Sequence, residues 1–157
     1  MPVYNDDKFV QRAVESILDQ DVKDIEVIVV DDGSTDKSKE VIKRLEDSDK
    51  RVKAIYFKKN KGACVARNAG AKIAKGENYV HLPADSLLYP GMARIWLNVL
   101  EDNPEHDFVY GGYRVTTEDF KPIDGGDFFF QPFDPYLLEV QNYIDGSFPI
   151  RAKVYWE

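Results

Sequence analysis

The chain has 157 residues, of which 43% are hydrophobic and 31% are charged, and its formal net charge is −7 at pH 7. This length and composition are typical of one soluble globular domain, and they exclude a disordered or fibrous chain. The acidic balance argues against a nucleic-acid backbone as the main partner. It does not exclude a nucleotide, because a mononucleotide needs only a local cationic group.

The cysteine content and the hydropathy pattern predict a cellular compartment. The single cysteine, Cys64, can form no internal disulfide, which favours a reducing environment. No apolar run reaches the roughly 18 residues of a membrane span, and the first residues contain no signal-peptide core. We therefore expect a cytoplasmic protein without a transmembrane segment, and the sequence leaves peripheral attachment to a membrane open.

Predicted strands and helices alternate along the first 60 residues. Residues 1–5 have the character of a strand end that leads into a turn. Apolar residues between 9 and 18 repeat at helical spacing, with Asp6 or Asp7 as the expected N-cap. Strands are predicted at 25–30 and 52–57, with a helix from about Asp36 to Leu45 between them. This alternation predicts a parallel α/β unit.

The same alternation continues beyond residue 60 and then weakens. Small residues from Lys61 to Ala74 predict a helix close to the sheet, and 78–82 form a short strand. A helix is expected at 90–100, with Pro90 in its first turn, followed by a strand at 107–114. Residues 116–135 read as a long loop or hairpin, and 134–143 are compatible with a helix.

Polar and acidic residues stand at the ends of three predicted strands. They are Tyr4-Asn5, Asp31-Asp32 with the turn Gly33-Ser34, and Asp85. In open α/β sheets ligands bind beyond the carboxyl ends of the strands, so a shared pocket is expected there. The alternative for Asp31 and Asp32 is that they cap the helix that follows.

Two segments add cations to the same edge of the sheet. They are Asn60-Lys61-Gly62 and Ala66-Arg67-Asn68-Ala69-Gly70. A diphosphate bound at the strand ends would require such cations.

In their order and spacing these motifs resemble the family 2 glycosyltransferases, which have the A-type nucleotide-diphospho-sugar transferase fold. The matching blocks are Pro2-Val3-Tyr4-Asn5, Val29-Val30-Asp31-Asp32-Gly33-Ser34-Thr35-Asp36, the two cationic segments, and Gly76-Glu77-Asn78-Tyr79-Val80 leading to Asp85 and Pro90. Gly146-Ser147 and Ile150-Arg151 resemble the stretch before the family's acceptor segment. The resemblance implies an α/β fold of three layers, an open and mostly parallel sheet with flanking helices. It also implies a single domain, with 1–115 as the donor-binding region and 116–157 as the start of a C-terminally truncated acceptor side.

The resemblance also implies a set of nucleotide-binding residues. They are Pro2, Tyr4, Asn5, Asp32, Ser34, Lys61, Gly62, Arg67 and Asp85. Tyr4 would flank the base, and Asp32 would accept a hydrogen bond from the imide N–H of uracil or thymine. Arg67 would approach the base or the phosphates. For Asn5 turn capping is an equal alternative, and Lys61 is as readily an exposed lysine.

The resemblance further implies a divalent cation and a catalytic base. The family usually carries Asp-x-Asp-Asp where this chain has Pro83-Ala84-Asp85-Ser86. Asp85 alone keeps an anionic ligand, so weak binding of Mn²⁺ or Mg²⁺ is expected. Inverting members use a carboxylate base on the acceptor side, and its position falls downstream of Glu157.

The expected activity is transfer of a sugar from a UDP- or dTDP-sugar to a hydroxyl of a carbohydrate or another acceptor, with inversion implied by the family. A degenerate, non-catalytic nucleotide-sugar binder is one alternative, motivated by Pro83 and Ser86. A phosphoacceptor module like the bacterial receivers is another, with 28–32 as its first strand and Asp85 as the phosphorylated residue. The helix and the Tyr4-Asn5 motif ahead of that strand speak against it.

Overall fold

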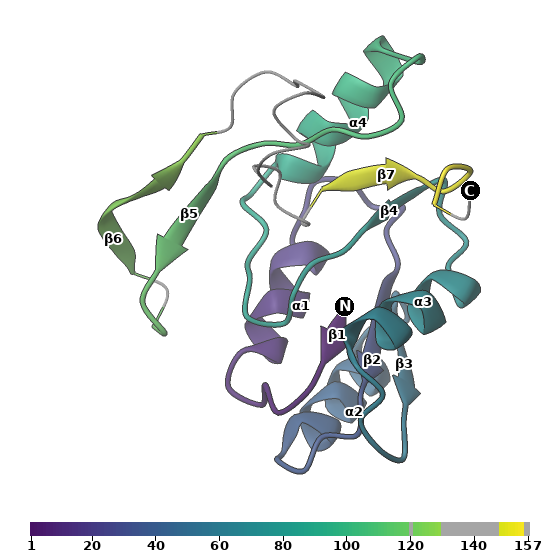
Figure 1. The fold of residues 1–157 in the computed structure, drawn as a ribbon, viewed down its shortest axis with the longest axis vertical. Coiled ribbons are helices and arrows are strands. Elements are labelled where there is room, and N and C mark those ends of the chain that lie inside the picture. Colours follow the sequence, from purple (N-terminus) through teal and green to yellow (C-terminus); the bar gives the residue numbers. More distant parts are fainter. Residues whose placement is uncertain (120, 130–147, 156–157) are drawn as a thin grey trace.

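A computed structural model describes residues 1–119, 121–129 and 148–155. A parallel sheet with flanking helices lies in the lower half of the view in Figure 1. Its strands are β1 (Pro2–Val3), β2 (Val27–Asp31) and β3 (Val52–Tyr56), in the order β1-β2-β3. The helices are α1 (Val10–Leu18), α2 (Ser38–Ser48), α3 (Ala63–Ile73) and α4 (Met92–Asp102). The predicted α/β class is therefore confirmed.

The remaining described strands form two separate antiparallel pairs. β4 (Asn78–Val80) pairs with β7 (Pro149–Arg151), and β5 (Tyr113–Thr116) pairs with β6 (Pro122–Phe128). The hairpin of β5 and β6 agrees with the loop or hairpin expected from residue 116 onward. The possible helix at 134–143 lies outside the described residues.

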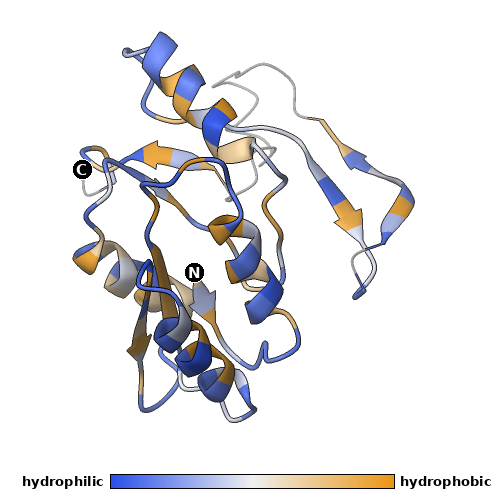
Figure 2. Cartoon of the chain, turned by 180° about the vertical axis from the view of Figure 1, so that it is seen from behind, coloured by the Kyte–Doolittle hydropathy of each residue, from blue (hydrophilic) through white to orange (hydrophobic). Residues whose placement is uncertain are grey.

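The central strand β2 is covered on both faces, as its continuous apolar run predicts. Val27 and Val29 belong to a buried cluster with residues of α1 and α2, including Val14 and Ile42. The opposite face of β2 meets α3 at Gly70, where an added Cβ would lie 3.4 Å from the Val30 side chain. Figure 2 shows this hydrophobic sheet flanked by helices of mixed polarity. The small residues of α3 therefore allow it to lie close to β2.

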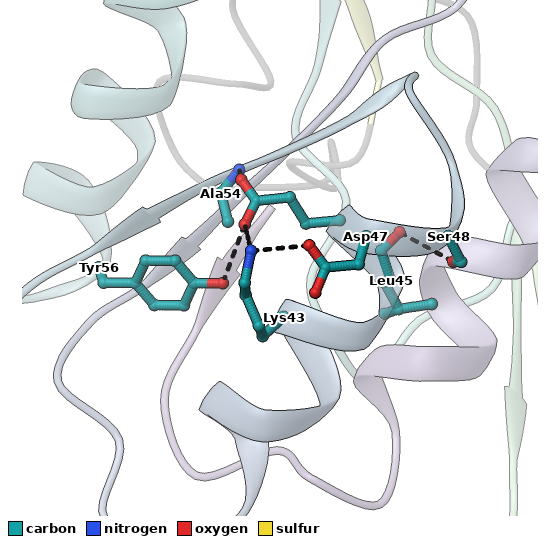
Figure 3. Close-up of polar contacts among 7 residues, drawn as sticks. Lys43, Leu45, Asp47, Ser48, Ala54 and Tyr56 are labelled. Carbon is teal, nitrogen blue, oxygen red and sulfur yellow. Dashed lines mark hydrogen bonds and ion pairs between the residues drawn. The ribbon is translucent and has the colours of Figure 1, made fainter.

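Polar contacts cover the outer edge of β3, where α2 packs against it (Figure 3). Glu46 accepts a hydrogen bond from the Ala54 amide at 3.1 Å, and Lys43 forms an ion pair with Asp47 at 2.7 Å. An exposed strand edge offers unpaired amides to other chains, and this contact occupies one of them.

Two predicted helix starts differ from the structure. α1 begins at Val10 without a side-chain cap, so the predicted N-cap role of Asp6 or Asp7 is wrong. The Asp6 carboxylate instead accepts the Tyr4 amide at 3.3 Å. α4 begins at Met92, because Gly91 before it has a left-handed backbone with φ +77°. Pro90 therefore precedes the helix and does not occupy its first turn.

The strand predicted at 107–114 is displaced. Phe108 forms only an isolated bridge with Ile150, and the regular strand β5 begins at Tyr113. Gly112 lies between them, and an added Cβ there would lie 2.3 Å from the Phe128 carbonyl oxygen. The chain therefore changes partner from β7 to β6 at a close backbone approach that the apolar pattern does not indicate. No described helix is long and apolar enough to cross a bilayer.

Gly33 forms the turn after β2 and touches the backbone of the loop after β3. Its φ is +76°, and an added Cβ would lie 2.5 Å from the Lys59 carbonyl carbon. We expect Gly33→Ala to lower the free energy of unfolding by about 2–4 kcal/mol, because backbone strain adds to a clash with main-chain atoms. Urea unfolding followed by circular dichroism measures this loss.

Gly91→Ala is the matched control. Gly91 has almost the same φ, and no atom lies within 4 Å of an added Cβ. We expect it to cost only about 1 kcal/mol from backbone strain. Equal losses for both variants would show that the contact between Gly33 and the loop does not hold the fold.

Candidate functional site

A cavity of about 370 Å³ lies at the carboxyl ends of β1 and β2. Its lining residues are Pro2, Val3, Tyr4, Asp6, Asp32, Asn60, Ala63, Arg67, Pro83, Ala84 and Asp85. It therefore brings together five predicted residues from four separate segments, namely Pro2, Tyr4, Asp32, Arg67 and Asp85. The other predicted residues, Asn5, Ser34, Lys61 and Gly62, lie outside its lining. Sequence reasoning missed Asp6, although it directly follows Tyr4-Asn5.

Asp32 joins the end of β2 to the loop before α3. Its side chain is buried, and its two carboxylate oxygens accept hydrogen bonds from the amides of Lys61 at 2.7 Å and Gly62 at 2.9 Å. An ionised carboxylate offers about four acceptor positions, so two of them remain for a ligand. Asp32 thus both fixes the loop and presents acceptor oxygen at the cavity.

The sequence left open the alternative that Asp31 and Asp32 cap the helix that follows. The structure shows that neither side chain caps α2. Asp31 accepts the amide of Ser34 at 3.1 Å, which closes the turn. The start of α2 is bound by Asp36, whose carboxylate accepts the Ser38 amide at 2.9 Å.

Asn5 and Ser34 connect the loops that follow β1 and β2. Asn5 has φ +60°, and its side-chain oxygen accepts the Thr35 amide at 2.8 Å. Its own amide donates to the Ser34 hydroxyl at 3.0 Å. These bonds support the turn-capping interpretation of Asn5. Both residues therefore tie together the loops after β1 and β2 without lining the cavity.

The cationic residues occupy two different positions. Arg67 lies on the second turn of α3 and lines the cavity. The ammonium group of Lys61 lies 4.3 Å from the centroid of the Phe57 ring, so its side chain makes a cation–π contact while its amide binds Asp32. The first turn of α3 contains no acidic residue, and Ala63 at this end lines the cavity. The amino end of a helix carries partial positive charge, which favours an anion here.

Two further carboxylates, those of Asp6 and Asp85, line the same cavity as Asp32. Burial raises the pKa of Asp6, and the hydrogen bond from the Tyr4 amide lowers it in part. The negative charges of Asp85 and Asp36 raise the pKa further, so the net shift is upward. Asp85 is exposed, and the Ser86 hydroxyl lies 3.5 Å from one of its oxygens. Within the described part of the chain, no three His, Cys, Asp or Glu residues are grouped to hold a metal ion.

The segments predicted to lead toward the acceptor are only partly described. Gly146, Ser147 and Glu157 lie outside the described residues. Ile150 and Arg151 belong to β7, and the Arg151 guanidinium donates to the carbonyl oxygens of Leu100 at 2.7 Å and His106 at 2.8 Å. Arg151 thus holds the end of α4 against β7.

The fold places the strand of Asp31 and Asp32 second, after β1. The receiver-like alternative, which needs that strand to be the first, is therefore wrong.

Solved structures with a similar fold include two that were determined with a nucleotide or nucleotide sugar. Staphylococcus aureus TarS, residues 1–349 in complex with UDP, gives a TM-score of 0.69 at 17% identity. The aligned region covers 96% of this chain and 45% of the TarS chain. A Pyrobaculum calidifontis mannosyltransferase in complex with GDP-mannose and Mn²⁺ gives a TM-score of 0.60 at 24% identity. The aligned region covers 74% of this chain and 34% of that one. At these identities the likeness shows the fold.

Curated relatives are similar in sequence as well. An uncharacterized glycosyltransferase of Haemophilus influenzae is 39% identical over 103 residues, which are 66% of this chain and 41% of the relative. The glycosyltransferase GlyG of Streptococcus pneumoniae is 32% identical over 139 residues, 88% of this chain and 44% of the relative. The chain thus spans less than half the length of either relative. The match to the family described as Glycosyl transferase family 2 covers residues 1–157, so the chain belongs to that family.

Proposed function

We propose that this chain is the donor-binding region of an enzyme that transfers a sugar from a nucleotide-diphospho-sugar to an acceptor hydroxyl. The observation that carries the proposal is the cavity in which Asp32, Arg67 and Asp85 meet at the carboxyl ends of parallel strands. A carboxylate that reads a base, a guanidinium and a metal-binding carboxylate are the groups that a nucleotide diphosphate requires. Residues 1–115 would form the donor region, and 116–157 the start of the acceptor side.

The chemistry follows from these positions. The acceptor hydroxyl loses its proton and attacks the anomeric carbon, and the diphosphate leaves with the electron pair of the broken bond. Arg67 and the amino end of α3 would stabilise the negative charge that develops on the diphosphate.

A divalent cation fits the oxygen donors on the cavity. Asp85 would hold it together with oxygens of the diphosphate, and Asp6 lines the same cavity. When bound, the cation neutralises charge on the leaving diphosphate. We expect the cation to bind weakly, because Pro83 and Ser86 stand where the family usually has acids.

The base that we propose is uracil or thymine. The structural relatives include one in complex with UDP and one in complex with GDP-mannose, so this fold accommodates both kinds of base. Each oxygen of Asp32 already accepts one amide. A single imide N–H is therefore easier to add than the paired donors on the guanine edge.

A non-catalytic nucleotide-sugar binder is the second candidate function. It is favoured by Pro83 and Ser86, which stand where the family usually has acids. Sugar transfer by a longer protein that includes this chain would exclude it. The lone cysteine favours a reducing compartment, so a cytoplasmic location is part of the proposal.

Asp32→Asn tests the reading of the base. We expect it to weaken UDP binding by about 1–3 kcal/mol, because the amide replaces an acceptor oxygen at a buried position. CDP has an acceptor at the position of the uracil imide, so its affinity should change less. Calorimetric titration of both nucleotides measures the ratio of their affinities, which cancels any general loss of folded protein.

Asp31→Asn is the control for this change. Asp31 is equally buried but binds the Ser34 turn and does not line the cavity. It should leave the ratio of UDP to CDP affinity unchanged. The proposed role of Asp32 is wrong if its variant also keeps the wild-type ratio.

A second experiment tests the metal ligand. Mn²⁺ should strengthen UDP binding to the wild-type chain, and Asp85→Ala should abolish this effect, because the variant lacks the anionic ligand at the rim. Ser86→Asp should tighten Mn²⁺ binding in the absence of nucleotide. UDP titrations with and without Mn²⁺ measure both changes.

Asp124→Ala serves as the charge-matched control, since Asp124 is an exposed carboxylate outside the cavity lining. It should retain the full Mn²⁺ effect. An Asp85→Ala protein that keeps the Mn²⁺ dependence would make Asp85 only a turn residue.

A further inference from the structure

The segment 86–93 leads from Asp85 to α4, and Figure 1 shows the connection between β4 and α4 running beside α1. Ser16 lies in the last turn of α1, and its hydroxyl accepts a hydrogen bond from the Leu88 amide at 3.0 Å. The same hydroxyl donates to the Ala13 carbonyl oxygen at 2.7 Å, which fixes its direction within the helix. Ser16 therefore attaches the segment to α1 shortly after Asp85.

A buried glutamine attaches the other end of this segment. Gln20 lies two residues beyond α1 and is only 1% exposed. Its side-chain nitrogen donates to the carbonyl oxygens of Ser16 at 2.9 Å and Tyr89 at 3.0 Å. Its side-chain oxygen accepts the Ala93 amide at 3.1 Å, one of the amides that a helix cannot pair internally at its amino end. Both N–H groups and the oxygen of this side chain are thus paired, as a buried amide requires.

The chain on the amino side of Asp85 is held by packing. Ala84 is 3% exposed and belongs to the buried cluster that also contains Val10 of α1. The Asp85 carboxylate itself is exposed, and its contact with the Ser86 hydroxyl at 3.5 Å is too long to hold it firmly. The position of Asp85 is therefore set by the main chain, through packing before it and hydrogen bonds to α1 and its end after it.

We propose that Ser16 and Gln20 are positioning residues for Asp85, and that through it they set how strongly a divalent cation promotes nucleotide binding. This inference rests on the proposed role of Asp85 as the metal ligand. Neither positioning residue lines the nucleotide cavity, as we call the cavity at the carboxyl ends of β1 and β2. Asp32 and Arg67, which would bind the nucleotide itself, follow β2 and lie in α3. The metal-dependent part of nucleotide binding should therefore depend on Ser16 and Gln20, and the metal-independent part should not.

The physical reason is the cost of ordering the segment that carries the metal ligand. A carboxylate that is already held in place loses little conformational freedom when it binds a cation, whereas a loosened segment must be ordered during binding. The cation would be shared between Asp85 and the diphosphate oxygens. A spread in the position of the carboxylate would therefore weaken the binding of the cation and of the nucleotide together.

Ser16→Ala and Gln20→Met remove these hydrogen bonds with little change in side-chain volume. We expect each variant to reduce the strengthening of UDP binding by Mn²⁺ by about three- to tenfold, as the loss of one net hydrogen bond would. UDP affinity without Mn²⁺ should stay within about twofold of the wild-type value. Ser16→Thr keeps the hydroxyl and should retain the Mn²⁺ effect. Calorimetric titrations of UDP with and without Mn²⁺ measure these changes.

Ser48→Ala is the matched control. The Ser48 hydroxyl donates to the Leu45 carbonyl oxygen at 2.9 Å at the end of α2 (Figure 3), which is the bond that Ser16 makes within α1, and Ser48 makes it far from the nucleotide cavity lining. This variant should keep the full Mn²⁺ effect. In an Asp85→Ala background, Ser16→Ala should change UDP affinity in Mn²⁺ no further. An equal effect of Ser16→Ala with and without Asp85 would show that Ser16 acts only on the fold, and would overturn the proposal.

Hydrogen exchange of the Ser86 amide separates failure of this inference from failure of the proposed metal role. This amide donates to the Pro83 carbonyl oxygen at 3.2 Å in the turn around Asp85, and its exchange should be at least about threefold faster in Ser16→Ala and Gln20→Met. If wild-type UDP binding responds to Mn²⁺ and both variants keep that response, the inference is wrong while the proposed function stands. A wild-type chain without any Mn²⁺ response would instead refute the metal role of Asp85. The exchange rates alone would then decide whether Ser16 and Gln20 position this residue, and unchanged rates in both variants would overturn the proposal.

Discussion

The bidentate contact of the Asp32 carboxylate with the amides of Lys61 and Gly62 is the interaction on which the nucleotide cavity depends. It attaches the loop before α3 to the end of the central strand. Gly33 permits this attachment, because any side chain there would collide with the backbone of the same loop. The amino end of α3 and Arg67 are thereby directed at the strand ends. A charged hydrogen bond to two amides is among the stronger polar contacts available to a fold.

This arrangement gives Asp32 a structural role and a binding role at once. A carboxylate that were free to rotate would lose conformational entropy when a base bound to it. Asp32 has already lost that freedom in the folded chain, because both of its oxygens are held. Its remaining acceptor positions point in fixed directions, which is the geometric condition for discriminating one hydrogen-bond pattern from another. Asn5 and Ser34 contribute in the same way, since they fix the adjacent loops without lining the cavity.

The sequence predicted the elements whose patterns are local. The apolar run of β2 and the small residues of α3 place both elements within a few residues of their observed bounds. The start of α4 depended on the left-handed backbone of Gly91, and the displaced strand at 107–114 depended on the close approach at Gly112. Both are properties of backbone conformation and of partners distant in the chain. Periodicity of side chains carries no information about them.

The roles of the site residues could also be predicted only in part from the sequence. Side-chain chemistry and the family resemblance identified Arg67 and Asp85, and both line the cavity. Lys61 contributes through its backbone amide, a role that any residue but proline can perform. Asp6 escaped notice because its residue type suited a helix cap, whereas its side chain turns back to the Tyr4 amide. Whether a polar residue near a strand end binds a ligand or a neighbouring loop is decided by the tertiary structure.

Arg67 lines both the nucleotide cavity and a larger cavity of about 690 Å³ between β2, α3 and α4. Burial lowers the pKa of His81 in the larger cavity to about 4, and the charges of the amino terminus and of Arg67 act in the same direction. His81 is therefore neutral at pH 7, and the guanidinium of Arg67 keeps its positive charge where it lines both cavities. An anion in the smaller cavity therefore meets the charge of Arg67 without competition from His81.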